Sequence, residues 1–254
     1  MLEVTQNLVQ DSLKSIRIKE GDGLLVHSAI QFLGRPEPGI GVYLDGIMDV
    51  LGTGGTIVVP TFTFDFPTAR EFDPGETPSK EMGSFSEYVR KHPGSKRTLH
   101  PMQSVACYGY YAEDLANRDT ASAFDPGSAY DRMLELDFKL LLLGADIQSV
   151  SILHYSEQRA RVPYRYWKEF TGHVLAPRGW EIRTYLMYVR DLNIDPRLSL
   201  EPVQQYLIKE GMWHSVKLNY GQIASCRLGD FVSAVDSFLK SDPWSLVTNR
   251  PANN

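Results

Sequence analysis

The amino-acid sequence predicts an α/β fold with a mixed central sheet. Leucine-rich or β-branched runs alternate with amphipathic segments along the chain, a pattern that favours helices packed on a sheet. Residues 173–191 have the pattern of a β-hairpin turning near Arg178–Gly179, and a hairpin brings antiparallel strands into the structure. The chain has 254 residues and no repeat or linker-like stretch, so we expect one domain over residues 1–254.

The same patterns place the individual elements. We expect helices over residues 4–18, 41–51, 84–94, 127–136, 150–160, 203–212 and 229–240. We expect strands over residues 24–28, 56–64, 100–110, 138–145 and 214–228, besides the hairpin. Residues 65–80 are rich in proline, acidic and hydroxyl side chains, which predicts an irregular surface loop.

Composition narrows the class of protein. The formal net charge of −5 argues against a dedicated nucleic-acid binder, which usually carries a basic excess. The N-terminal segment has no apolar stretch of a secretory signal, and no apolar run reaches the roughly 18 residues that span a bilayer. The two cysteines, Cys107 and Cys226, form no metal-ligand spacing. We therefore expect a cytoplasmic protein with no membrane or nucleic-acid partner.

Three predicted strands end in polar residues. The runs "LLVHS", "VVPTFTF" and "LLLLGAD" each leave an apolar stretch through hydroxyl, imidazole or carboxylate side chains. Ligands of open α/β sheets gather at the carboxyl ends of strands. The three ends supply one site if the strands are neighbours, although any strand can leave the core through polar residues.

Two further motifs invite a phosphate-binding interpretation. The glycines of "LGTGGT" precede a strand and do not have the spacing of a dinucleotide or P-loop motif, so they indicate a turn. The stretch "RKHPGSKRTLHP" (90–101) concentrates Arg90, Lys91, Lys96 and Arg97. Such a cluster can bind the phosphates of a cofactor, and it equally fits the solvated, basic end of a helix.

The segment "SILHYSEQRA" (151–160) places His154 and Glu157 on one face of a helix. A carboxylate one turn away can accept a hydrogen bond from one ring nitrogen and raise the basicity of the other. Metal binding is the rival, but two ligands are fewer than the three protein ligands of a catalytic zinc. A third interpretation is a structural helix face, with Ser151 as the N-cap.

Taken together, these segments resemble the aminoglycoside 3-N-acetyltransferase family of antibiotic N-acetyltransferases, which differs from the GNAT acetyltransferases. The resemblance rests on "GDGLLVHSAIQFLG", "GTGGTIVVPTFTF", "PGSKRTLHPMQSVACYG", "GSAYDRM" and "KLLLLGADIQSVSILHYSEQ", in the family's order. It covers roughly residues 5 to 240. It implies a single-domain α/β/α layered fold and acetyl-CoA (coenzyme A) as co-substrate, without a metal.

The resemblance also assigns site residues. His154 and Glu157 match the catalytic pair of the family's "LHxxE" segment. Contact with CoA is implied for Ser28, Ala29, Ile30, Thr61, Phe62, Arg97, His100 and Ser104. The first loop commonly reads "HSSL" followed by a basic or other residue. Here Ala29 replaces the second serine and Gln31 stands at the position that can be basic, so a side-chain contact there is lost.

The expected acceptor is an aminoglycoside or a related amino sugar. A polycationic antibiotic favours an acidic cleft, yet the segment after His154 combines cations and aromatic rings: Arg159, Arg161, Arg165 and Lys168 with Tyr155, Tyr164, Tyr166 and Trp167. Such residues suit a sugar that carries one free amine, including one linked to a nucleotide diphosphate, or they form an outward helix face or an oligomer contact. The sequence leaves a homo-oligomer open, and antibiotic resistance is one role that the family implies.

The expected reaction is direct acetyl transfer in a ternary complex. His154 is the expected general base and Glu157 its partner, while backbone N–H groups near Ser28 and the Thr61 hydroxyl are candidate donors to the oxyanion. The sequence leaves two other classes of function open. One is a metal-dependent hydrolase that uses His154 and Glu157, and the other is a non-catalytic CoA- or sugar-binding protein.

Overall fold

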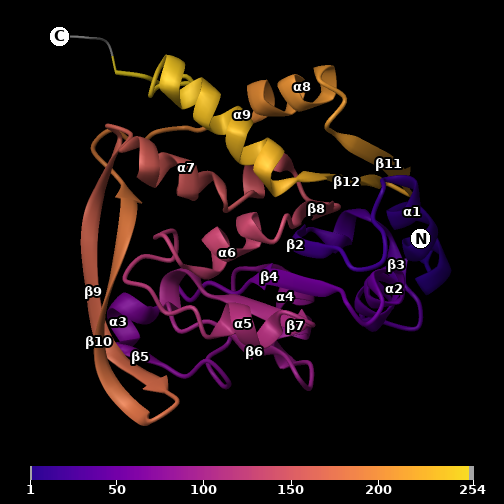
Figure 1. Ribbon diagram of the computed structural model, residues 1–254, viewed down its shortest axis with the longest axis horizontal. Coiled ribbons are helices and arrows are strands. Elements are labelled where there is room, and N and C mark those ends of the chain that lie inside the picture. Colours follow the sequence, from indigo (N-terminus) through magenta and orange to yellow (C-terminus); the bar gives the residue numbers. More distant parts are fainter. Residues whose placement is uncertain (1, 252–254) are drawn as a thin grey trace.

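The protein is built around a seven-stranded mixed sheet. The computed structural model describes residues 2–251, and Figure 1 shows the sheet at the centre of the molecule. The strand order is β11 (His214–Leu218), β12 (Gly221–Arg227), β8 (Lys139–Leu143), β2 (Gly23–Ser28), β4 (Thr56–Pro60), β7 (Val105–Gly109) and β6 (Lys96–Arg97). The central strands β8, β2 and β4 run parallel, while the strands outside them pair antiparallel. The predicted mixed sheet is confirmed.

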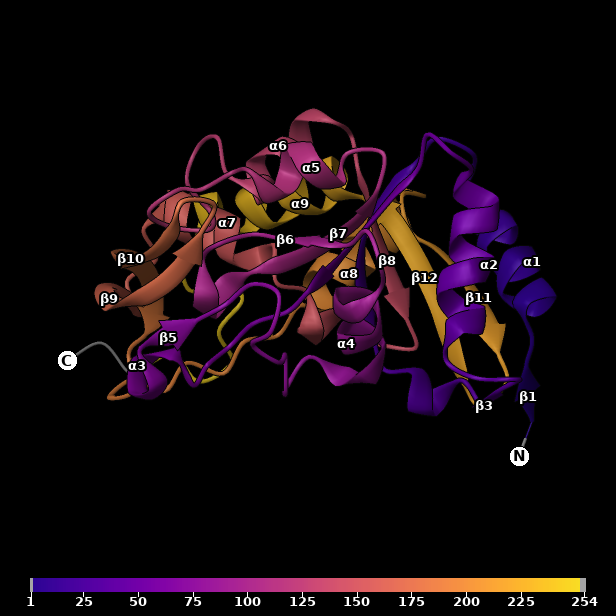
Figure 2. The same cartoon turned by 90° about the horizontal axis from the view of Figure 1, so that it is seen from below.

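Helices cover both faces of this sheet, which confirms the predicted α/β/α layers. One face carries α1 (Gln6–Ser15), α2 (Gly41–Leu51) and α4 (Gly83–Lys91). The other carries α5 (Ala112–Ala116), α6 (Ala129–Glu135), α7 (Leu153–Ala160), α8 (Glu201–Lys209) and α9 (Leu228–Ser241). Figure 2 shows the sheet between the two groups. Within residues 2–251 no helix combines the length and apolar character needed to cross a membrane.

Two cores form because the strands are apolar on both faces. Along β2, Leu24 and Val26 pack against α1 and α2, whereas Leu25 packs on the opposite face, against the α9 side. Successive side chains of a strand point to opposite faces, so a continuous apolar run supplies both layers. Burying each such side chain contributes about 1.5–3 kcal/mol.

A long hairpin, β9 (Arg165–Ala176) and β10 (Gly179–Arg190), stands beside the sheet with β5 (Glu71–Phe72) and α3 (Phe66–Ala69) at its inner face (Figure 1). The predicted turn is confirmed. However, β9 begins at Arg165, since the polar stretch before residue 173 also pairs with β10. The expected loop over residues 65–80 carries α3 and β5, because a third apolar cluster lies under the hairpin. A short parallel pair of strands, β1 (Glu3–Val4) and β3 (Arg35–Pro36), connects the segment before α1 to the segment before α2.

The loops that follow β2 and β8 approach each other closely. Ser28 bridges Gly144, and the backbone N–H of Ala29 donates to the carbonyl of Leu143 at 2.9 Å. Gly144 has φ +74°, and a Cβ at that position would lie 2.7 Å from the Ala29 carbonyl oxygen. Glycine is therefore required there. This contact brings two of the polar strand ends to one place.

Candidate active site

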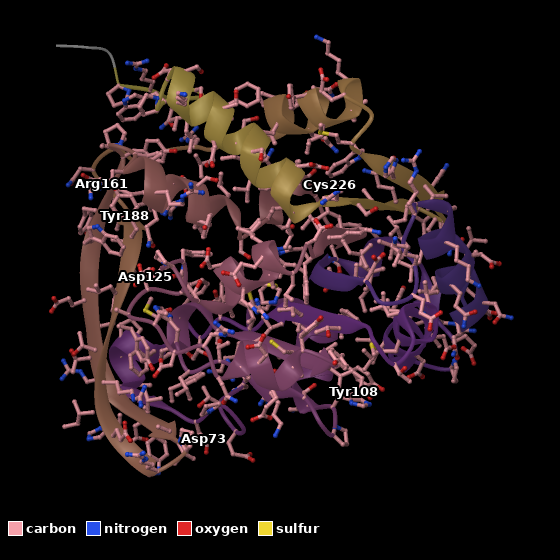
Figure 3. All side chains as sticks on the ribbon, in the orientation of Figure 1. Asp73, Tyr108, Asp125, Arg161, Tyr188 and Cys226 are labelled. Carbon is pink, nitrogen blue, oxygen red and sulfur yellow. The ribbon has the colours of Figure 1, made fainter. Side chains whose placement is uncertain are left out.

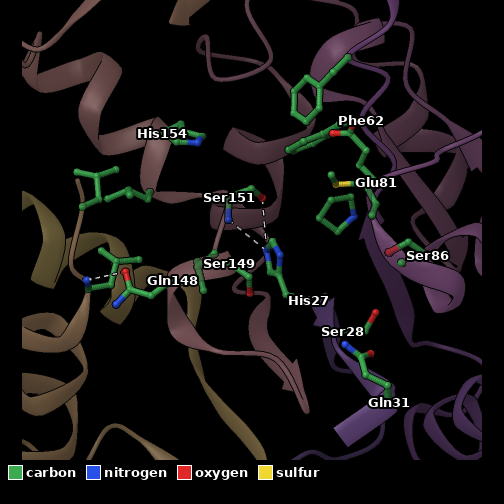
Figure 4. Close-up of a pocket in the computed structure, with 18 residues that line it drawn as sticks. His27, Ser28, Gln31, Phe62, Glu81, Ser86, Gln148, Ser149, Ser151 and His154 are labelled. Atoms are coloured by element: carbon green, nitrogen blue, oxygen red, sulfur yellow. Dashed lines mark hydrogen bonds between the residues drawn. The ribbon is translucent and has the colours of Figure 1, made fainter. Parts of the chain in front are cut away.

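A cleft of about 500 Å³ opens at the carboxyl ends of β8, β2 and β4. These are the three strand ends that the sequence proposed for one site, and their adjacency is confirmed. The cleft is lined by His27, Ser28, Gln31, Pro60, Phe62, Phe64, Glu81, Met82, Gly83, Ser86, Gln148, Ser149, Val150, Ser151, Leu153, His154, Leu198 and Leu200. Figure 4 shows His27 beside Ser151 in the middle of the view, with His154 to the left and Glu81 and Ser86 to the right.

His154 and Glu157 are in direct contact, as their spacing predicts. Nδ1 of His154 lies 2.6 Å from Oε2 of Glu157. The His154 side chain is 30% exposed and faces the cleft, whereas that of Glu157 is 0% exposed and lies behind it. A carboxylate accepts a hydrogen bond from Nδ1–H, which leaves the lone pair of the neutral ring on Nε2. The pair can therefore accept a proton from a molecule in the cleft.

Arg165 supports Glu157 from the far side. Its Nε lies 2.9 Å from the same Oε2 at ion-pair distance, although the N–H is not aimed for a good hydrogen bond, and its side chain is only 8% exposed. Burial raises the pKa of the Glu157 carboxyl, but the hydrogen bond and charge of His154 and the charge of Arg165 outweigh burial. The pKa of Glu157 therefore lies below its usual range. Glu157 is an anion at neutral pH.

The chain reversal after α7 explains how Arg165 reaches Glu157. Arg161 has φ 50° and ψ 50°, a left-handed conformation that ends the helix. The hydroxyl of Tyr188 on β10 then donates to the Val162 carbonyl at 2.8 Å, which holds the start of the hairpin against the helix (Figure 3). The sequence offered Arg165 either as an acceptor-binding cation or as part of an outward face or oligomer contact, and the structure instead places it behind the His154–Glu157 pair.

A second histidine lines the cleft and was not singled out from the sequence. The backbone N–H of Ser151 lies 3.3 Å from Nε2 of His27, and Oγ of Ser151 lies 3.4 Å from the same nitrogen. The prediction that Ser151 caps the helix is wrong, because the N-cap is Ile152 and no side chain caps it. The available signal was the polar end of "LLVHS", but the contact joins residues 124 positions apart.

The residues predicted to contact CoA separate into two groups. Ser28 and Phe62 line the cleft, and Ala29 and Ile30 follow directly in the turn after β2. Thr61, Arg97, His100 and Ser104 are buried and are not part of its lining. The residues of this second group therefore do not lie on the surface of the cleft.

Arg97 organises that second group. Its Nε donates to Oγ of Thr61 and of Ser104 at 3.0 and 3.1 Å, and its NH2 donates to the Thr61 carbonyl. Burial lowers the pKa of Arg97 to about 9. The Thr61 hydroxyl also donates to the Ser104 carbonyl at 3.2 Å, so this candidate oxyanion donor is engaged within the protein. These bonds hold the loop that carries Phe62.

The other members of the predicted groups are also satisfied inside the protein. His100 Nδ1 accepts from the Gln103 N–H at 3.2 Å, and its Nε2 lies 3.1 Å from the Leu186 carbonyl. Burial lowers the pKa of His100 to about 4. In the basic stretch, Arg90 and Lys91 pair with Glu87, and Lys96 pairs with Glu113. The helix-end interpretation of that stretch fits these contacts.

The metal-hydrolase alternative lacks its third ligand. Across residues 2–251, no group of three or more histidine, cysteine or acidic side chains is arranged to hold a metal ion. A catalytic zinc site usually has three protein ligands, and this alternative names only two, His154 and Glu157.

The fold and the cleft define an α/β protein with a His154–Glu157 pair at the carboxyl ends of its central strands. Residues 25–240 match the family described as aminoglycoside 3-N-acetyltransferase, and the chain belongs to this family. By family it is an acyltransferase, and the resemblance seen in the sequence is confirmed.

Curated relatives agree with this assignment. The aminoglycoside N(3)-acetyltransferase III of Salmonella sp. is 26% identical over 193 residues, which cover 69% of this chain and 68% of the relative. The SPbeta prophage-derived aminoglycoside N(3′)-acetyltransferase-like protein YokD of Bacillus subtilis (strain 168) is 25% identical over 259 residues. That match covers 91% of this chain and 90% of YokD.

Solved structures share the fold at low identity. AAC-IIIb in a binary complex with CoASH has a TM-score of 0.83 at 20% identity, covering 98% of this chain and all of that one. AAC-VIa bound to sisomicin has a TM-score of 0.82 at 21% identity, covering 94% of this chain and 98% of that one. The predicted fold class is confirmed.

Proposed function

We propose that this protein transfers an acetyl group from acetyl-CoA to an amine of an aminoglycoside or a related amino sugar. The observation that carries the proposal is the 2.6 Å contact between His154 Nδ1 and Glu157 Oε2 at the edge of an open cleft. Family membership supports the reaction class, and the CoASH complex of AAC-IIIb supports the co-substrate. No resident metal is invoked.

The proposed chemistry is direct transfer. An ammonium has no lone pair, so Nε2 of His154 accepts its proton before the amine nitrogen forms its bond to the thioester carbonyl carbon, and the nitrogen releases a second proton to solvent as the amide forms. The carbon–sulfur bond then breaks, and the thiolate of CoA takes the proton back from the imidazolium. Glu157 stabilises that imidazolium, and Arg165 keeps Glu157 ionised and in place.

The proposed CoA site follows the cleft lining. Ser28 supplies a hydroxyl and Phe62 an apolar surface, and Ala29 and Ile30 belong to the same turn. Apolar walls with a few polar groups suit the pantetheine arm of CoA. For Thr61, Arg97, His100 and Ser104 we propose an indirect role, since their hydrogen bonds fix the loops on which the lining residues stand.

The proposed acceptor carries few amines. Glu81 is the single carboxylate among the described residues that line the cleft. Several ammonium groups desolvated together favour several carboxylates, so a polycation is poorly matched. The cationic segment contributes less than the sequence suggested, because Arg159 pairs with Asp236 and Arg165 with Glu157.

The proposal is tested by an acceptor screen read as release of free thiol from acetyl-CoA. We expect an amino sugar with one free amine, linked to a nucleotide diphosphate, to give a higher kcat/KM than kanamycin-like compounds. A clear preference for the antibiotics would reject this acceptor assignment while leaving acetyl transfer intact. Absence of thiol release with every amine, together with tight CoA binding, would favour the non-catalytic alternative.

Neither cysteine is expected to form an acyl-enzyme. Cys107 and Cys226 are buried in the core, and burial raises the pKa of both thiols well above the usual range. The thiolate is the nucleophile, so both side chains are inert. Mass spectrometry after incubation with acetyl-CoA alone should show the unmodified chain. A stable adduct of one acetyl group on either cysteine would contradict direct transfer.

A further inference from the structure

His27 occupies a position from which it can act on a molecule in the cleft. It stands near the end of β2, two residues after Leu25 and therefore on the same face of the sheet. The residue is 6% exposed and lines the cleft that also contains His154 (Figure 4). The proposed mechanism assigns no role to this buried imidazole.

The surroundings of His27 fix its tautomer. A backbone N–H can only donate, so the Ser151 N–H at 3.3 Å requires a lone pair on Nε2 of His27. Burial lowers the pKa of His27 to about 3, and the ring is therefore neutral at pH 7. A neutral ring with its lone pair on Nε2 carries its proton on Nδ1. The Ser151 hydroxyl has a further neighbour, the Tyr130 hydroxyl at 3.1 Å, which steadies this arrangement.

The Nδ1–H group has no acceptor among residues 2–251. The hydrogen bonds of His27 to other described side chains and backbone groups both involve Nε2. Nδ1 of His27 is not one of the fully buried side-chain atoms that lack a partner, so it remains open to the cleft that His27 lines. An oxygen of a molecule bound in the cleft can therefore accept its hydrogen bond.

The two histidines of the cleft therefore differ in the hydrogen-bonding group that stays free: a lone pair on His154 and an N–H on His27. Glu157 accepts from Nδ1–H of His154 and leaves a lone pair on Nε2. The amide of Ser151 occupies the lone pair of His27 and leaves an N–H on Nδ1. Attack of an amine on a thioester needs both kinds of group: an acceptor for the proton of the amine, and a donor to the carbonyl oxygen, where negative charge develops.

We propose that Nδ1–H of His27 donates a hydrogen bond to the carbonyl oxygen of the acetyl thioester and stabilises the oxyanion. This inference rests on the proposed acetyl transfer. The proton stays on His27 throughout, while the nitrogen–carbon bond forms and the carbon–sulfur bond breaks. A neutral imidazole is suited to this role, because an electrophilic neutral histidine polarises a carbonyl in triosephosphate isomerase. His27 would replace the Thr61 hydroxyl, which is engaged elsewhere.

Two substitutions of His27 distinguish the hydrogen bond that Nδ1–H would donate to the substrate from the hydrogen bond that Nε2 accepts from the Ser151 N–H. His27→Gln can still present an oxygen to the Ser151 N–H but has no donor at the Nδ1 position. His27→Asn can place an amide N–H near the Nδ1 position but leaves Ser151 unpaired. We expect His27→Gln to lower kcat about 10²–10³-fold, with an unchanged Kd for CoA, since this is the usual effect of removing one oxyanion donor. His27→Asn should retain more of the wild-type kcat than His27→Gln.

Near wild-type kcat in His27→Gln, or a lower kcat in His27→Asn than in His27→Gln, would overturn the proposal. His214→Gln, on β11, serves as the matched histidine control and should keep wild-type kcat. If a His27 variant does not fold, ¹⁵N NMR of wild-type protein with labelled histidines still decides the matter. The proposal requires a neutral Nδ1–H tautomer for His27 at pH 7, and an Nε2–H signal refutes it. This spectrum does not depend on turnover, so failure of acetyl transfer itself is recognised separately.

Discussion

Replacement of His154 by alanine is expected to lower kcat by about 10²–10⁴-fold, the usual contribution of a general base. The change removes the ring nitrogen that faces the cleft but leaves the sheet and the turn proposed to contact CoA untouched. The Kd for CoA should therefore be unchanged. Measurement at a pH where the acceptor amine is mostly protonated makes the effect largest, because the base is then indispensable.

The matched control for this substitution is His173→Ala. His173 is exposed on β9 and points away from the inner cluster of the hairpin, so its removal should leave kcat unchanged. Turnover of His154→Ala at the wild-type rate under these conditions would refute the assignment of His154 as the base.

Glu157→Gln is expected to affect stability more than catalysis. The substitution keeps the volume of the side chain but leaves the buried Arg165 guanidinium without a carboxylate. Breaking a buried pair by removing one partner costs about 3–5 kcal/mol. The loss of kcat should be smaller than for His154→Ala, because the amide oxygen can still accept from Nδ1–H. Thermal or urea unfolding and steady-state kinetics measure the two effects.

Two further variants sharpen this test. In the double variant Glu157→Gln with Arg165→Met, the buried charge is gone as well, so stability should recover substantially while kcat does not. Asp236→Asn removes the partner of the exposed Arg159 and should cost at most about 1 kcal/mol. If Asp236→Asn and Glu157→Gln lower the free energy of unfolding equally, the Glu157–Arg165 pair contributes no more to stability than an exposed ion pair, and the prediction fails.

The pair also predicts the direction of an acid effect. The pKa of Glu157 is lower in the folded protein than its usual value. Its contribution to stability is therefore present above the usual carboxyl range and is lost as the pH falls through the folded-state pKa. Glu157→Gln should reduce the steepness of the acid limb in a plot of unfolding free energy against pH.

Sequence patterns predicted those parts of the site that depend on local spacing. His154 and Glu157 are one helical turn apart, so periodicity alone brings them together. The three strand ends could be identified because apolar runs stop abruptly at "VHS", "PTF" and "GAD". The hairpin that suggested antiparallel strands lies in a separate sheet with β5, and the antiparallel pairs of the seven-stranded sheet come instead from β11–β12, β12–β8, β4–β7 and β6–β7.

The contacts that were not predicted all depend on tertiary packing. His27 meets Ser151 only because β2 and β8 are neighbours, and no spacing rule spans 124 residues. Arg165 resembled a surface cation with aromatic neighbours that suggested a binding surface. The left-handed turn at Arg161, which directs Arg165 back toward Glu157, could not be predicted from the residue pattern. Thr61 was expected to serve the reaction, but a distant guanidinium, Arg97, engages its hydroxyl.

Arg165 is the first residue of β9 and pairs with Glu157, so the number of residues between α7 and β9 is constrained. Side chains alternate between the two faces of a strand, so one residue inserted between Arg161 and Arg165 would turn the guanidinium to the opposite face. An insertion at the hairpin tip, near Arg178, shifts no residue of this connection. Natural length variation among close relatives should therefore concentrate at the tip of the hairpin, while the three residues between Arg161 and Arg165 keep their number.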